Sequence, residues 1–186
     1  MGPKSNAPNS AKLVFMPEAK EHTHVQRWVS DEDSLYFKLA GLGYPGFAYL
    51  GEMSGLDPTE VVCQILLRPN VNPRLMMGVP WVLSHHDLNW LSLIAEVKAH
   101  EAQNRLGYLV HLARKAAQSQ ERSAVVDLLS QWEDTLAACR LDKEDMMGKT
   151  SMSDLEKEWL ERYRPEEATY WHVLTNDGLD SLQHYV

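Results

Sequence analysis

The chain has 186 residues, of which 44% are hydrophobic and 24% are charged, and its formal net charge is -8. This composition is ordinary for a globular domain and argues against disorder over most of the length. No apolar run approaches the roughly 18 residues of a membrane-spanning helix, and the amino-terminal stretch lacks the apolar segment of a secretory signal. We therefore expect a cytoplasmic protein without a membrane partner.

The first part of the chain, residues 1–29, is predicted to be a flexible or irregular arm ahead of one α-helical domain over residues 30–186. Residues 1–30 carry four basic and two acidic side chains, whereas residues 150–186 carry three and eight. Non-specific nucleic-acid affinity comes from clustered Lys and Arg side chains that neutralise phosphates. The charge of the domain thus disfavours a broad nucleic-acid surface.

A helix is predicted after Ser30, and it ends in the stretch AGLGYPGF, residues 40–47. This stretch contains a G-x-G-x-x-G pattern, which in dinucleotide-binding folds follows a strand and opens a helix. The residues before Gly41 have a helical pattern, and no second strand with a terminal acidic residue follows about 20 residues later. We interpret the glycines as a helix C-cap and a turn, and we predict no cofactor.

The next stretch, FAYLGEMSGLDPTEVVCQILL, covers residues 47–67. It has a small residue at Gly51, a glycine four residues later at Gly55 and a β-branched residue at Val61. In this spacing it resembles the helix-turn-helix unit of bacterial repressors. The resemblance implies that the small residue lets two helices approach and that the second glycine adopts a positive φ in the turn.

The second helix of this unit begins with acidic residues. In a repressor these positions contact bases and phosphates, yet Asp57 and Glu60 would repel phosphate. The candidate nucleic-acid contacts are Thr59, Gln64 and Arg68. Three interpretations stay open: a plain helical hairpin, a helix-turn-helix fold adapted to protein contact, and a DNA-binding unit.

The domain is expected to have a helix-turn-helix-like part over residues 30–84 and a helical bundle over residues 85–186. Pro80 is expected to kink or divide the helix that Asn72 caps. Apolar residues then recur at helical spacing, which predicts one long central helix that starts after Asp87 and runs to about Ala117. The fold class is therefore all-α: a multi-helix bundle with a helix-turn-helix-like amino-terminal unit and a long central helix.

A second amphipathic helix is predicted to pack antiparallel against the central one, because the loop between them is short. Its buried stripe is expected to contain Val125, Leu128, Leu129, Trp132, Leu136 and Cys139. Further helices are predicted after a capping box at Ser153, after Pro165 and after the turn at Asn176–Gly178.

The aromatic residues suggest a binding surface. Trp, Tyr and Arg supply most of the binding energy at protein interfaces, and Met adapts to varied partners. Gly107 costs about 1 kcal/mol inside a helix, which indicates close packing or a functional kink at that point. The predicted partner-binding residues are Trp81, Trp90, Asn104, Arg105 and Tyr108.

No complete catalytic or metal-binding motif is present. Glu96 and His100 lie four residues apart on the central helix, but no C-x-x-C or H-E-x-x-H accompanies them, and we predict no metal site. Cys63 and Cys139 fall at apolar helical positions and are expected to be buried, reduced thiols.

Four blocks, GYPGFAYL, NPRLMMGVPWVL, DLNWLSLIAEVKAHEAQNRLGYLVHLARK and RYRPEEATYWHVLT, resemble a family of uncharacterised bacterial proteins associated with regulatory or antitoxin-type genes. The resemblance implies a regulatory role and no catalytic residues. We predict a regulatory protein that binds a partner protein and that is open to homo-oligomer formation. The alternatives are a sequence-specific DNA-binding regulator or antitoxin, and a small metal-dependent enzyme.

Overall fold

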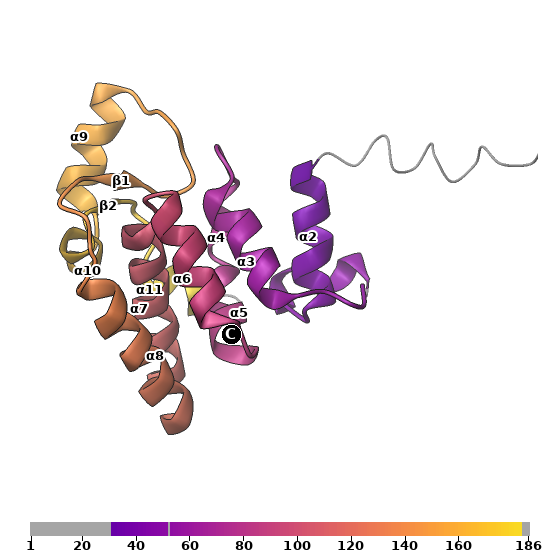
Figure 1. The fold of residues 1–186 in the computed structure, drawn as a ribbon. Helices are drawn as coiled ribbons and strands as arrows, with labels where there is room; N and C mark the ends of the chain where they lie inside the picture. The colour runs from indigo at the N-terminus through magenta and orange to yellow at the C-terminus, as the bar shows by residue number, and fades with distance from the viewer. Residues whose placement is uncertain (1–30, 52, 184–186) are drawn as a thin grey trace, which may run out of the picture. The chain divides into compact units, whose positions relative to one another are not determined.

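The computed structural model describes residues 31–51 and 53–183, and the predicted arm over residues 1–29 lies outside them. The chain divides into residues 1–30 and residues 31–186, and the second unit is described below. Its described part is mainly helical and has only two very short strands, which confirms the predicted all-α class (Figure 1).

The first two elements are α2 (Asp31–Gly41) and the 3-10 helix η1 (Pro45–Leu50). Gly43 has a positive φ of 87°, and the backbone N–H of Tyr44 donates to the carbonyl of Leu39 at 3.0 Å. This is the bonding of a helix that ends in a left-handed residue. The prediction that the glycine pattern is a helix C-cap is confirmed, and a helix rather than a strand precedes Gly41.

Three helices follow: α3 (Pro58–Leu67), α4 (Pro73–Met76) and α5 (Val79–His85). The side chains of Asp57 and Asn72 cap α3 and α4, as predicted. Pro80 lies in the first turn of α5, where its missing N–H leaves no intrahelical bond unmade. The predicted division of the chain near Pro80 is therefore confirmed.

The predicted long central helix is wrong, because the chain forms two helices, α6 (Trp90–Ala99) and α7 (Gln103–Ser119). Glu101 between them has a φ of 53°, and the N–H of Ala102 donates to the carbonyl of Val97 at 2.9 Å. This bend lets the apolar faces of both helices reach the same core. The cap of α6 is Asn89 rather than Asp87, since its side chain accepts from the N–H of Ser92.

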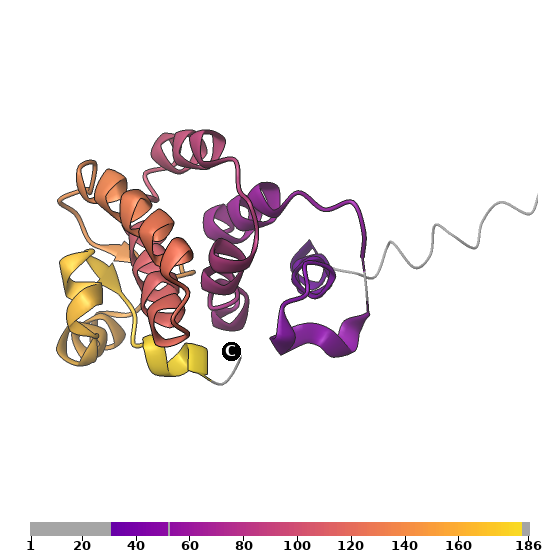
Figure 2. The ribbon, with the colours of Figure 1, turned by 90° about the horizontal axis from the view of Figure 1, so that it is seen from below.

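The helix α8 (Ser123–Ala137) packs along α7 after a short turn, as predicted, and Figure 2 shows the two helices side by side. Leu129, Trp132 and Leu136 are buried, which confirms the centre of the predicted stripe. Leu128 is 42% exposed. Cys139 lies beyond the end of α8 and is half-buried, so its predicted place on the buried stripe is wrong.

The carboxyl-terminal part contains the helices α9 (Asp154–Tyr163), α10 (Glu166–Tyr170) and α11 (Leu179–Gln183). Two short parallel strands, β1 (Asp145–Met146) and β2 (Val173–Leu174), lie beside them. The side chain of Ser153 accepts from the N–H of Glu156 and caps α9, as predicted.

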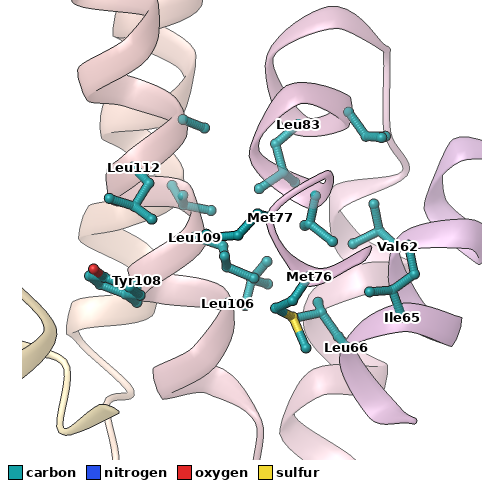
Figure 3. Packing of buried hydrophobic residues seen from close by; sticks show 14 of the residues in the cluster. Val62, Ile65, Leu66, Met76, Met77, Leu83, Leu106, Tyr108, Leu109 and Leu112 are labelled. Atoms are coloured by element: carbon teal, nitrogen blue, oxygen red, sulfur yellow. The ribbon is translucent and has the colours of Figure 1, made fainter. Parts of the chain in front are cut away.

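The hydrophobic core surrounds α7. Leu106 and Leu109 of α7 point toward Met77, which lies between α4 and α5 (Figure 3). Tyr108 leaves α7 on another face, toward the carboxyl-terminal segment. The single helix α7 therefore joins the amino-terminal helices to the elements that follow α8.

Candidate functional site

Asn104, a predicted partner-binding residue, is fully buried. Its Nδ2 donates to the carbonyls of Leu141 and Lys143 at 3.0 and 3.1 Å, and its Oδ1 accepts from the N–H of Leu141 at 2.9 Å. Buried backbone groups need such partners, so this side chain fixes the segment that follows α8.

Arg105 and Tyr108 also bond to the chain itself. The Nε of Arg105 donates to Oδ2 of Asp145 at 2.9 Å, and its Nη1 donates to the carbonyl of Leu66 at 2.8 Å. The hydroxyl of Tyr108 donates to the carbonyl of Asp177 at 2.6 Å. Burial, followed by the charges of nearby carboxylates, raises the pKa of Tyr108 far above its ordinary value, so the phenol is a permanent donor.

Gly107 lies against the buried ring of Trp171, which confirms the predicted close packing. A Cβ at Gly107 would lie 2.1 Å from Cζ3 of Trp171, a separation that no pair of carbon atoms tolerates. Trp171 is fully buried, so a shift of its ring would disturb the surrounding core. The glycine allows contact between α7 and the end of α10.

Trp81 and Trp90 are partly buried and belong to separate aromatic clusters. Trp81 stacks on His85 with ring centroids 4.4 Å apart, and Trp90 stacks on Trp132 at 4.6 Å. The structure therefore does not bring the five predicted partner-binding residues together on one surface. Their role in partner binding stays a prediction.

A narrow, mostly apolar pocket lies beside Trp81. Nη1 and Nη2 of Arg122 donate to Nε2 of His85 and to the carbonyl of Ser84, at 3.1 and 2.7 Å. Burial lowers the pKa of His85, which suits a neutral ring that accepts from Arg122. The pocket is partly open to solvent and is lined by Tyr44, Met77, Pro80, Trp81, Ser84, His85, Ala116, Gln120 and Leu182.

The three candidate nucleic-acid contacts, Thr59, Gln64 and Arg68, differ in how far their side chains are exposed. Thr59 is 5% exposed, and its hydroxyl accepts from the N–H of Asn89 at 2.9 Å. Gln64 accepts from Nζ of Lys38 and donates to Glu60, both at 2.7 Å. Arg68 is half-buried at the end of α3. Nucleic-acid contact through these residues stays a prediction.

The segment that resembles a helix-turn-helix unit has a 3-10 helix in place of a first α-helix. Gly55 has a positive φ of 74°, and Val61 is buried, as the resemblance implies. The expected close approach at Gly51 is wrong, because a Cβ there would meet nothing within 4 Å. The close approach is at Gly41, where a Cβ would lie 2.7 Å from the carbonyl oxygen of Met53.

The remaining chemical candidates are dispersed. Cys63 is half-buried rather than buried, and burial raises its pKa, so the thiol stays protonated. Glu96 and His100 are each about 55% exposed and lie 3.9 Å apart. Residues 31–51 and 53–183 contain no group of three or more His, Cys, Asp or Glu side chains arranged to hold a metal ion.

A half-buried ion-pair cluster links α7 to α8. Nδ1 of His111 lies 2.9 Å from Oε1 of Glu133, and Nε of Arg114 donates to Oε2 of the same carboxylate at 2.5 Å. Burial alone would raise the pKa of Glu133, but the hydrogen bonds from His111 and Arg114 outweigh it and lower the pKa below its usual value. The cluster stabilises the helix pair, and both oxygens of Glu133 are already paired, with His111 and Arg114.

The surface of α9 carries an apolar row that we call the α9 row: Leu155, Trp159 and Tyr163. Their exposed fractions are 78%, 49% and 58%, and the rings of Trp159 and Tyr163 are 5.2 Å apart. Residues four apart share one face of a helix, so the three side chains are neighbours. Figures 1 and 2 both show α9 at the edge of the described unit.

A neighbouring face of α9 holds the helix on the fold and leaves this row pointing outward. Leu160 is the residue of α9 that is buried, and it anchors the helix on the rest of the fold. The sequence DLEKEWLERY contains both Leu160 and the α9 row, and spacing alone does not say which one faces the core. This row was not predicted as a site from the sequence, although its residues follow the i, i+4, i+8 spacing of one helix face.

Comparisons with known proteins give no relative from which a role could be transferred. The chain matches no protein-family model, and neither curated proteins nor solved structures give a significant match. Among the helices of the described residues, none has the length and apolar character needed to cross a membrane. Any functional assignment therefore depends on the surface chemistry itself.

Proposed function

We propose that this chain is a regulatory protein that acts by binding a partner protein, and that the α9 row is the contact surface. The observation that carries the proposal is the exposure of Leu155, Trp159 and Tyr163 on consecutive turns of one helix. Trp and Tyr are the residues most enriched among binding hot spots, and an apolar helix face suits a groove on a partner.

A role of the α9 row in the hydrophobic core has less support. A helix that contributed its aromatic residues to the core would bury them, as Trp171 and Tyr108 are buried. Scattered single apolar residues on a surface need no explanation, but a row of three with two aromatic rings in contact is a contiguous patch.

The proposal is tested by affinity capture with matched variants of the full chain. Leu155→Glu alters the α9 row, and Leu91→Glu is the control, because both leucines are 78% exposed on helices. The bait proteins are incubated with a lysate of the cells that produce the protein, and bound proteins are quantified by mass spectrometry.

We expect a protein that the wild type and Leu91→Glu retain and that Leu155→Glu and Trp159→Ala lose. Loss of about tenfold or more is the size expected for hot-spot residues. Equal capture by all four baits would contradict the proposal. A Leu91-dependent partner would instead assign the contact to α6.

A further inference from the structure

The α9 row lies in the most acidic part of the chain. Residues 154–180 carry eight acidic and three basic side chains, a net charge of -5, against -8 for all 186 residues. Helical geometry places Glu158 on one side of the α9 row and Glu156 on the other. Glu158 is paired with Arg162 and Glu156 with Lys149, so a partner that covers the row meets an ion pair at each edge, within a segment of net negative charge.

The basic side chains of this segment are already paired with carboxylates. Nζ of Lys157 lies 3.8 Å from Oε1 of Glu161, and Nη2 of Arg162 lies 3.4 Å from Oε1 of Glu158. Arg164 donates to both oxygens of Glu144, at 3.0 and 2.8 Å. The excess of negative charge is thus not relieved by a free cation among these three.

Three exposed carboxylates of the segment 154–180 have no hydrogen bond or ion pair within the described residues. They are Asp154 at the start of α9, Glu166 at the start of α10 and Asp180 at the start of α11. A carboxylate near a helix amino terminus is favourable for the helix, so these groups are stable as anions. They add to the negative potential that an approaching partner experiences.

Resting on the proposed function, we infer that the α9 row docks a basic amphipathic helix of the partner, with apolar side chains on one face and Lys or Arg on its borders. The row runs from Leu155 to Tyr163, eight steps of about 1.5 Å or about 12 Å in all, which corresponds to two or three apolar side chains of a facing helix. Charge complementarity then favours Lys and Arg at the rim, where they speed association and exclude acidic competitors.

A second copy of the chain fits this surface less well. Symmetric docking of α9 on α9 would bring two segments of net charge -5 together. Like charges across an interface oppose association. The same carboxylates that repel a second copy attract a basic helix.

The inference is tested with two fluorescein-labelled synthetic helices of about 18 residues, or five turns. Both have Leu on one face, and the remaining positions are Lys in one peptide and Glu in the other. Fluorescence anisotropy measures their binding to the full chain, to Trp159→Ala and to a charge variant at the two edges of the row, Glu156→Lys with Glu158→Lys. The control variant, Asp127→Lys with Asp134→Lys, makes the same charge change on exposed sites of α8.

We expect the Lys peptide to bind, the Glu peptide not to bind, and about 0.5 M salt to weaken the complex. Trp159→Ala and the α9 charge variant should each weaken binding about tenfold, with a smaller effect of the α8 control. Equal effects of the two charge variants would overturn the basic-helix inference.

The failures of the inference and of the proposed function are distinguishable. If the Lys and Glu peptides bind equally well and Trp159→Ala loses binding of both, the charge requirement is overturned and the α9 row remains a docking surface. Binding of the Lys peptide that Trp159→Ala leaves unchanged would overturn both. A dimer in sedimentation that dissociates on Trp159→Ala would replace the basic helix with a second copy.

Discussion

Helix α7 points polar groups, those of Asn104 and Tyr108, into the protein interior, whereas helix α9 exposes the apolar side chains of the α9 row to solvent. Asn104 and Tyr108 of α7 bond to backbone carbonyls 37 or more residues away in sequence and are fully buried. Trp159 and Tyr163 of α9 remain about half exposed. Residue type alone therefore misleads about function, because buried polar groups can be structural and exposed aromatic groups are the ones a partner can reach.

The comparison predicts that substitutions on α7 cost stability and that substitutions on the α9 row cost binding. The largest expected effect is that of Gly107→Ala, because the new Cβ would overlap the ring of Trp171. The gain in helix propensity does not offset overpacking in a filled core, and we expect a loss of about 3 kcal/mol in the free energy of unfolding. Urea denaturation measures it.

A second substitution, Trp171→Leu, tests whether overlap with the Trp171 ring causes the loss expected for Gly107→Ala. A smaller side chain relieves the overlap, so Gly107→Ala should cost less in the Trp171→Leu background than in the wild type. Additive losses in the double variant would show that the packing of these two residues is not the reason for the glycine.

The next effect is that of Asn104→Ala, which leaves two carbonyls and one N–H of the segment after α8 without their partner. We expect a loss of about 2 kcal/mol, the usual order for buried groups left unsatisfied. Asn104→Leu fills the volume but restores no hydrogen bond, so it should be no better than alanine. Full rescue by leucine in thermal unfolding would assign Asn104 a packing role.

These contacts also show what the sequence could and could not predict. The all-α class and the caps at Asp57, Asn72 and Ser153 depend on residues close together in sequence, and they are confirmed. The bend at Glu101 has no glycine or proline to mark it. Its positive φ is imposed by the packing of α6 and α7 on one core, which local propensity does not contain.

The site residues divide in the same way, into features set by local sequence and features set by distant contacts. The close packing at Gly107 was predicted, because an unfavourable residue inside a helix needs a reason. The partners of Asn104 lie 37 and 39 residues away, so local pattern cannot distinguish a structural amide from a binding one. For α9, the α9 row and the single residue Leu160 compete for the core, and the choice of Leu160 depends on tertiary packing.

A smaller loss of stability is expected when the half-buried carboxylate of Glu133 is replaced, and the exposed carboxylate of Glu158 serves for comparison. Glu133→Gln weakens the contacts to His111 and Arg114, and we expect a loss of about 1 kcal/mol at neutral pH. Glu158→Gln is the control, because Glu158 and Arg162 are 68% and 66% exposed, and surface pairs contribute little.

The cost of Glu133→Gln should depend on pH. The pKa of Glu133 is lowered in the folded chain, so its stabilisation is present above the ordinary carboxyl pKa and is lost as the pH falls through the lowered value. Unfolding curves of the wild type and of Glu133→Gln should therefore converge in acid. A difference that grew toward low pH would reverse the assigned direction of the shift.

The smallest expected change in stability is that of Trp159→Ala, and it decides the comparison. Trp159 contacts Tyr163 but keeps 49% of its surface in water, so we expect a loss of about 0.5 kcal/mol or less. The same variant should lose partner capture about tenfold. A loss of several kcal/mol in urea unfolding would place Trp159 among the structural residues, and α9 would then resemble α7 rather than contrast with it.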